Sequence, residues 1–213
     1  MEKYGILFDL DGTLLDTLED IRDAINHSLR QCGYPERTLA EARQFVGNGA
    51  KRLMEQAVPP GEDPARALAE FQAYYPAHCQ IKTRPYDGIL PALAAISAKY
   101  PIAIVSNKPD IAVQPLCGHY FPGIYARGEH PGCPRKPAPD MVYRTMADIG
   151  VEKCIYIGDS EVDVLTAKNA GVPCVSVLWG FRDKADMEAV GGNCFCETPE
   201  TLTETIEEII HGK

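Results

Sequence analysis

Residues 4–13 read Tyr4-Gly5-Ile6-Leu7-Phe8-Asp9-Leu10-Asp11-Gly12-Thr13, an apolar run that ends in two aspartates. The run predicts a buried β-strand. Because strand side chains alternate between faces, Asp9 and Asp11 should leave its end on the same side. Two carboxylates held close together repel each other, and burial makes their charge more costly still. A positive partner is therefore expected beside them, and a divalent metal with a phosphate group is the first candidate.

Helices and strands alternate along the chain from about residue 84 onwards. Apolar strands are expected near 102–105, 124–126, 154–157, 174–178 and 194–196, with helical patterns between them. Continuously apolar strands that alternate with helices indicate a parallel sheet covered on both faces. The predicted fold class is therefore α/β, with a Rossmann-like doubly wound parallel sheet as its core.

The stretch 16–82 contains helical patterns and no good strand. Its first helix is expected to begin at Thr17, with Asp20 three residues on completing a capping box. We interpret residues 16–82 as an inserted α-helical cap domain. The core domain is then made of residues 1–15 and 83–213.

Composition and charge restrict the possible partners. The chain has 213 residues, 45% of them apolar, and a formal net charge of −9, which disfavours nucleic acid or an acidic membrane as partner. No signal peptide or transmembrane run is visible, so a cytoplasmic location is expected. The eight cysteines are scattered through expected helices and strands, and reduced thiols are expected for them. The oligomeric expectation is a monomer or a homodimer.

Acidic and polar side chains follow three of the expected strands. Ligand sites in such sheets lie at the carboxyl ends of the strands, where Asp9, Ser106 and Asp159 are all placed. A loop before a helix adds Lys136. Carboxylates and phosphate oxygens suit Mg²⁺, while a hydroxyl and a lysine can hold phosphate oxygens. These are the parts of a magnesium-dependent phosphoryl-transfer site.

The same residues resemble the four motifs of the haloacid dehalogenase superfamily. The segment 9–13 is similar to the first motif, Ser106 to the second, Lys136 to the third, and Gly158-Asp159-Ser160-Glu161-Val162-Asp163 to the fourth. All four occur in the family's order, and the resemblance covers essentially the whole chain. The helical insertion after the first motif resembles the cap of the phosphoglycolate phosphatase-like subgroup.

The resemblance implies a mechanism and a role for each residue. Asp9 would attack phosphorus to give an aspartyl-phosphate, and Asp11 would protonate the leaving group and then activate water. Mg²⁺ is the implied cofactor, bound by the Asp9 side chain, the Asp11 carbonyl and Asp159, with Asp163 hydrogen-bonding at the site or reaching the ion through water. The phosphate would be held by Ser106, Asn107 and Lys136, with Thr13 shaping the acidic loop.

The leaving group would be recognised by the cap. Gly47, Asn48 and Gly49 precede a helix whose first N–H groups suit an anion, and Arg52 lies one turn further on. A small phosphate ester with a carboxylate, such as 2-phosphoglycolate, would fit such a loop. Against this, glycines before a helix often serve only the turn, and Arg52 alone would be an ordinary surface cation.

Other activities remain open. Within the same superfamily the alternatives are a pyrophosphatase, a phosphosugar phosphatase or a phosphoglucomutase-type enzyme. A phospho-ligand sensor without catalysis is the alternative from a different class. A sensor would be expected to lack one of Asp9, Asp11 or Lys136, and all three are present.

Overall fold

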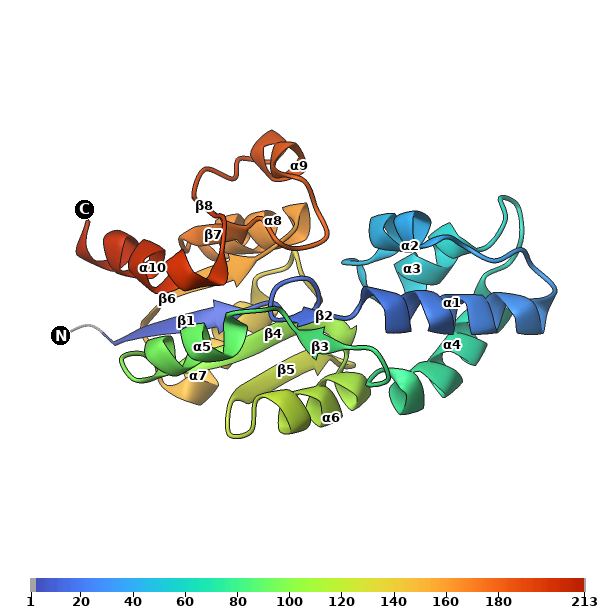
Figure 1. Cartoon of the computed structure of the whole chain (residues 1–213), viewed down its shortest axis with the longest axis horizontal. Helices are drawn as coiled ribbons and strands as arrows, with labels where there is room; N and C mark the ends of the chain where they lie inside the picture. The colour runs from blue at the N-terminus through green and yellow to red at the C-terminus, as the bar shows by residue number, and fades with distance from the viewer. Residues whose placement is uncertain (1–2, 213) are drawn as a thin grey trace.

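A computed structural model describes residues 3–212 and shows an α/β sheet with a group of helices at one end (Figure 1). The main sheet has six strands in the order β5-β4-β1-β6-β7-β8, and all neighbouring pairs are parallel. This confirms the predicted fold class. The strands are β1 (Tyr4–Phe8), β4 (Ile102–Pro109), β5 (Tyr125–Glu129), β6 (Lys153–Gly158), β7 (Cys174–Val177) and β8 (Phe195–Cys196).

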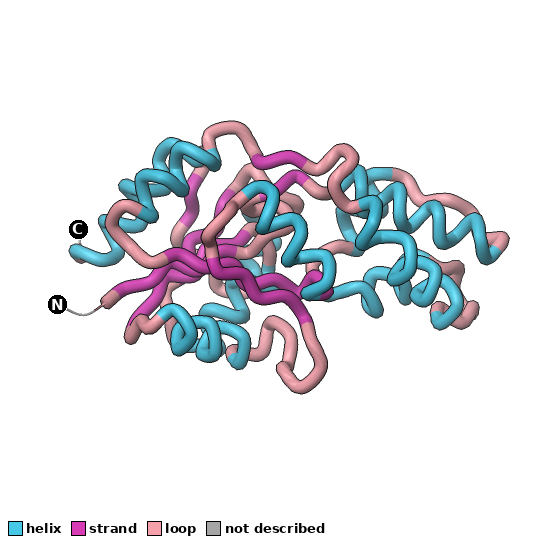
Figure 2. The backbone as a smooth tube through the Cα atoms, turned by 90° about the horizontal axis from the view of Figure 1, so that it is seen from below, coloured by secondary structure: helices cyan, strands magenta, loops and turns pink. Residues whose placement is uncertain are grey.

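Helices cover both faces of this sheet because alternate strand residues point to opposite sides. On β1, Leu7 joins an apolar cluster with α7 (Asp140–Ile149) and α8 (Glu161–Ala170), whereas Ile6 and Phe8 join the cluster on the other face. That second face is covered by α5, α6 and α10, and Figure 2 shows helices on both sides of the strands. These three helices are Ile89–Ser97, Asp110–Tyr120 and Leu202–His211.

The stretch expected to be helical folds into four helices beyond the carboxyl ends of the strands (Figures 1 and 2). They are α1 (Leu18–Cys32), α2 (Leu39–Phe45), α3 (Gly49–Ala57) and α4 (Ala65–His78). We call these four helices the helical cap. The division of the chain into a core and a cap domain at residues 16 and 82 stays a prediction.

Two short strands that the sequence analysis did not anticipate join the helical cap to the sheet. β2 (Leu15–Asp16) and β3 (Arg84–Pro85) form an antiparallel pair, with Leu15 opposite Pro85 and Asp16 opposite Arg84. The chain therefore leaves and re-enters the core through one narrow ribbon. Such a pair of adjacent crossings is suited to act as a hinge.

The predicted capping box at the start of α1 is wrong. The Thr17 hydroxyl donates instead to Asp11 Oδ1 at 2.7 Å. The buried Asp20 carboxylate accepts the backbone N–H groups of residues 81–83 at 2.8–3.0 Å. Local spacing suggested a cap, but the carboxylate finds three better donors on the chain segment that returns from α4.

Replacing Asp20 with alanine should lower the free energy of unfolding by about 2–4 kcal/mol, because three buried N–H groups lose a charged acceptor. Urea unfolding monitored by circular dichroism measures this loss. The control is Asp23→Ala, which removes a half-exposed ion pair to Lys82 and should change stability by less than about 1 kcal/mol. Equal losses in the two variants would contradict the role assigned to Asp20.

Two further differences concern the core. β4 continues four residues beyond the predicted strand 102–105, and its register with β5 shifts between Val105 and Pro109. A short helix, α9 (Lys184–Ala189), was not predicted; Asp183 and Asp186 form a capping box at its start.

All eight cysteines are free, as expected. Among the described residues no helix is long and apolar enough to cross a membrane.

Candidate active site

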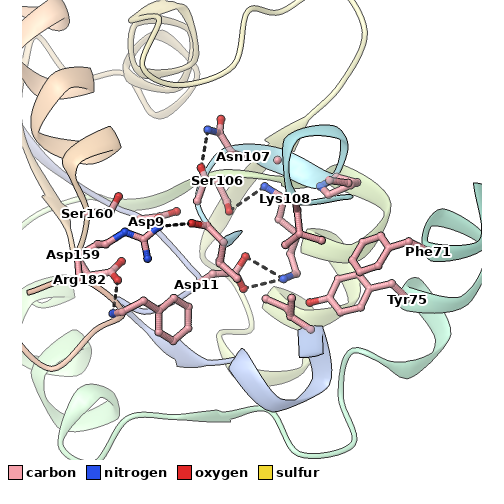
Figure 3. A pocket seen from close by; sticks show the side chains of 18 residues that line it. Asp9, Asp11, Phe71, Tyr75, Ser106, Asn107, Lys108, Asp159, Ser160 and Arg182 are labelled. Carbon is pink, nitrogen blue, oxygen red and sulfur yellow. Dashed lines mark hydrogen bonds and ion pairs between the residues drawn. The ribbon is translucent and has the colours of Figure 1, made fainter. Parts of the chain in front are cut away.

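The carboxyl ends of β1, β4 and β6 face the helical cap across a small cavity (Figure 3). Its volume is about 50 Å³. The core contributes Asp9, Asp11, Ser106, Asn107 and Asp159 to its lining, and the cap contributes mainly apolar side chains. The strand ends thus bring together the acidic and polar residues that the sequence predicted to meet.

Three buried carboxylates form the acidic centre. One oxygen from each of Asp9, Asp159 and Asp163 lies within 4.8 Å of the others. Burial, with repulsion from Asp163, raises the pKa of Asp9 to about 7, and burial with repulsion from Asp163 and Asp9 also raises the pKa of Asp159. Oxygen donors whose negative charges repel so strongly are suited to a divalent cation.

Lys136 provides the positive charge that the protein itself places beside these carboxylates. Its Nζ lies 2.9 Å from Asp9 Oδ1 and 2.8 Å from Asp163 Oδ1, and it donates to the Tyr156 hydroxyl at 3.0 Å. Burial opposes its charge, but Asp163 and Asp9 raise its pKa, so it remains an ammonium. Lys136 lies outside the cavity lining, so it acts on Asp9 from behind.

Asp159 is held by groups from two distant parts of the chain. Its Oδ1 accepts from the Thr13 hydroxyl at 3.0 Å and its Oδ2 from the Phe181 N–H at 2.7 Å. A Cβ on Gly12 or Gly180 would lie 2.3 Å from an Asp159 atom, so both positions require glycine. Thr13, predicted to shape the acidic loop and bind substrate, is placed against this carboxylate and outside the cavity lining.

Asp163 supports the centre with both of its oxygens. Oδ1 contacts Lys136, and Oδ2 accepts from the Ser160 N–H at 3.1 Å and the Ser160 hydroxyl at 2.6 Å in the capping box of α8. Because these donors already occupy both carboxylate oxygens, the arrangement favours a hydrogen-bonding role for Asp163 over direct metal binding.

Ser106 and Asn107 have different placements although they are adjacent. Ser106 lines the cavity, and its hydroxyl oxygen accepts the Lys108 N–H at 3.2 Å. The Asn107 amide donates to the carbonyls of Gly47 and Lys136 and accepts the Lys136 N–H. Asn107 was predicted to bind phosphate. Its side chain joins β4 to the loop that contains Lys136 and to the loop that contains Gly47.

Lys108 is a site residue that the sequence analysis missed. Its buried Nζ lies 2.7 Å and 2.9 Å from the two carboxylate oxygens of Asp11, as the dashed lines in Figure 3 show. Asp11 is thus held by Lys108 and Thr17. Residues two apart on a strand share a face. A predicted strand that continued to residue 108 would therefore have placed Lys108 on the same side as Ser106.

Arg182 is the second residue missed. From the loop after β7 it donates to the carbonyls of Arg43, Gln44 and Val46 at 2.6–3.2 Å, and it lies 3.1 Å from Glu161. These carbonyls belong to the C-terminal end of α2, where a cation is favourable. Arg182 therefore fastens the helical cap to the core at Val46, next to the Gly47 carbonyl that Asn107 binds.

Of the residues expected to recognise the leaving group, only two line the cavity. They lie in the loop 46–49 that leads into α3, which we call the cap loop. Gly47 and Gly49 line the cavity, whereas Asn48 and Arg52 are outside the lining. Arg52 is more than half exposed and pairs with Glu55 at 3.2 Å. A Cβ on Gly49 would crowd Glu129 and Arg135 of the core, so close packing also favours glycine there.

Comparison with known proteins identifies the family. The model of the haloacid dehalogenase-like hydrolases matches residues 6–177. The chain is 34% identical to phosphoglycolate phosphatase 1 of Pseudomonas aeruginosa over 192 residues, which is 83% of this chain and 70% of the relative. It is 34% identical to a phosphoglycolate phosphatase of Mesorhizobium japonicum, with 86% of each protein covered.

A solved structure supports the same family assignment. A crystal structure from Lactobacillus delbrueckii subsp. bulgaricus, provisionally assigned as a phosphoglycolate phosphatase, has a TM-score of 0.90 and 36% identity, with 97% of this chain and 99% of that one covered. Fold and site together define a phosphatase built on a parallel sheet. The chain belongs to the haloacid dehalogenase-like hydrolase family, and within it resembles the phosphoglycolate phosphatases.

Proposed function

We propose that the protein is a Mg²⁺-dependent phosphatase that hydrolyses a small phosphomonoester through an aspartyl-phosphate, with 2-phosphoglycolate as substrate. The observation that carries the proposal is the acidic centre of Asp9, Asp159 and Asp163, of which Asp9 and Asp159 line the cavity. Relatives with 34% identity that are named phosphoglycolate phosphatases support the substrate.

The chemistry assigned to the side chains follows from their contacts. An Asp9 oxygen attacks phosphorus, and the bond from phosphorus to the ester oxygen breaks. Asp11 donates a proton to that departing oxygen, and then removes one from the water that hydrolyses the aspartyl-phosphate. Lys136 holds Asp9 in place, while Ser106 contacts the phosphate oxygens.

The acidic centre fits a magnesium ion. Asp9 and Asp159 would bind it through side chains and Asp11 through its carbonyl oxygen, with Asp163 held behind them by Lys136 and Ser160. When bound, the ion supplies positive charge that offsets the carboxylates and the phosphate oxygens. The raised pKa of Asp9 supports this assignment. It means that Lys136 alone does not balance the buried, mutually repelling carboxylates, and a bound cation would supply the missing positive charge.

Magnesium should stabilise the protein more at pH 8 than at pH 5.5. Without metal, the folded state raises the pKa of Asp9 from 3.8 to about 7, so that stability falls as pH rises through this interval. Ionised carboxylates are also the form that binds metal. At a concentration 100 times Kd the gain is about 2.7 kcal/mol.

Thermal unfolding with MgCl₂ and with EDTA measures this effect without recourse to activity. Asp159→Asn removes one expected ligand and should abolish most of the magnesium-induced shift, whereas Asp16→Asn, at the partly exposed Asp16–Arg84 pair, should preserve it. A stabilisation that is independent of pH, or unchanged in Asp159→Asn, would contradict the metal assignment.

The alternatives predict different substrates. A hexose phosphate would place sugar hydroxyls against the apolar cap side of the cavity, and a pyrophosphatase would use a leaving group without carbon. A phosphate-release assay with Mg²⁺ should therefore compare 2-phosphoglycolate, hexose phosphates, nucleotides and pyrophosphate. We expect fastest release from 2-phosphoglycolate. Release from none of them would overturn the phosphatase proposal and favour a sensor. A cytoplasmic location and a monomeric or homodimeric state complete the proposal.

A further inference from the structure

The part of the cavity under the helical cap is largely apolar. Its wall is formed by Ile21, Val46, Ala50, Leu53 and Phe71. At this end two polar side chains are also present, Lys108 from β4 and Tyr75 from α4. An apolar wall with a few polar groups in fixed positions is the usual form of a small-molecule subsite, in which the polar groups decide what is bound.

Lys108 lies beside Asp11, the residue proposed to protonate the leaving group. Its side chain is 3% exposed, and its Nζ contacts Asp11 and lies 4.8 Å from the centre of the Tyr75 ring. The other nearby cations have different partners. Lys136 lies behind Asp9, and the Arg182 guanidinium is directed at backbone carbonyls of α2.

Tyr75 brings a buried hydroxyl whose proton has no acceptor among the described residues. The residue is 3% exposed, and the polar group beside its hydroxyl is the Lys108 ammonium, itself a donor, so among residues 3–212 the hydroxyl proton has no acceptor. Figure 3 shows the ring beside Lys108, with its hydroxyl directed towards the Lys108 ammonium at the edge of the cavity. Burial raises the pKa of Tyr75, so the hydroxyl keeps its proton and remains a donor. A buried donor without an acceptor is costly, and an acceptor on a ligand would remove that cost.

We propose that Lys108 and Tyr75 form the subsite for a carboxylate on the leaving group, so that the substrates are phosphate esters of small 2-hydroxy acids. This inference rests on the proposed phosphatase function. In such an ester the carboxylate is attached to the carbon that bears the departing oxygen. Asp11 donates to that oxygen, so the cation that already contacts Asp11 is within reach of the carboxylate.

Binding therefore exchanges one ion pair for another. Both oxygens of Asp11 contact Lys108. An incoming carboxylate takes over Lys108 and the Tyr75 hydroxyl, and Asp11 is left free to turn towards the departing oxygen. An ester of equal size without a carboxylate offers Lys108 no competing anion, so the ion pair between Lys108 and Asp11 persists. Selectivity then arises from the core strand β4 and helix α4, rather than from Arg52.

The test compares 2-phosphoglycolate with 2-hydroxyethyl phosphate, which has the same length and no carboxylate. The native enzyme should prefer 2-phosphoglycolate in kcat/KM by roughly 100-fold, the size of a buried charged contact. Lys108→Met should reduce this preference to within about 3-fold, and Tyr75→Phe should reduce it by roughly 10-fold. The matched control is Lys51→Met on the exposed face of α3, which should preserve the preference.

A binding measurement separates recognition from chemistry. In an Asp9→Asn background with Mg²⁺, calorimetry should show that 2-phosphoglycolate binds at least 10-fold more tightly than 2-hydroxyethyl phosphate. Adding Lys108→Gln should abolish the difference. Circular dichroism shows whether each variant folds. Tyr75→Phe removes only a hydroxyl whose proton has no acceptor, so it decides the question if the Lys108 variants fail to fold.

The outcomes are distinguishable from failure of the proposed function. If the native enzyme releases phosphate from no ester, the phosphatase proposal itself is wrong. If it hydrolyses both esters equally well, the phosphatase proposal stands and the carboxylate subsite is wrong. The subsite is also wrong if Lys108→Met and Tyr75→Phe keep the native preference, or if Arg52→Met alone removes it.

Discussion

Asp9→Asn should reduce turnover by at least about 10⁴-fold, because an amide cannot replace the carboxylate as nucleophile. The variant should nevertheless fold. Asparagine has the same shape, and it removes one of three negative charges that crowd the acidic centre. In EDTA at pH 8 its melting temperature should therefore equal or exceed that of the native protein, since the pKa of Asp9 is raised to about 7 in the native state.

Two measurements check the role of Asp9. Phosphate release from 2-phosphoglycolate gives the rate, and mass spectrometry after acid quenching detects a phosphoryl group on the native chain but none on Asp9→Asn. Asp11→Asn provides the contrast. It should slow turnover by roughly 10²–10⁴-fold, yet still form the phosphoenzyme from an ester with a good leaving group. Appreciable turnover by Asp9→Asn would exclude it as nucleophile.

The position of the acidic centre could be predicted because it depends on local pattern and sheet geometry. Apolar runs identify β1 and β6, and parallel strands place the residues that follow them at one edge. The strand pattern therefore predicts that Asp9 and Asp159 meet, and the resemblance to the family adds Lys136, which lies in a loop. The helical content of 16–82 was predictable for the same reason, since apolar residues recur at helical spacing.

Contacts between the helical cap and the core could not be predicted in this way. Lys108, Tyr75 and Arg182 obtain their roles from the docking of helices on strand ends far away in sequence. Asp20 shows the same limit: a local capping box was expected, but a distant segment offers three N–H groups. Sequence spacing reports neighbours along one element, whereas these contacts depend on how two elements pack.

Lys136→Met should have the largest effect on stability. The lysine side chain is 1% exposed, and its ammonium contacts Asp9 and Asp163, which are buried with it. Removing one partner of a buried ion pair costs about 3–5 kcal/mol, because the remaining charges keep their desolvation penalty. Methionine fills most of the space, so the loss measures charge rather than a cavity.

The loss should depend on pH and on metal in a defined direction. At pH 8 in EDTA the carboxylates must ionise without Lys136, and the full loss is expected. Near pH 5 it should be smaller, because the raised pKa of Asp9 lets that carboxyl remain protonated and neutral. Mg²⁺ should recover part of the loss at pH 8.

Urea unfolding of Lys136→Met at both pH values, with and without Mg²⁺, measures these differences. The control is Lys99→Met at the exposed Lys99–Glu207 pair, expected to change stability by less than about 1 kcal/mol under every condition. A loss that is equal at pH 5 and pH 8 would mean that Lys136 contributes packing rather than charge. In that case the stability of the acidic centre would depend on some other source of positive charge.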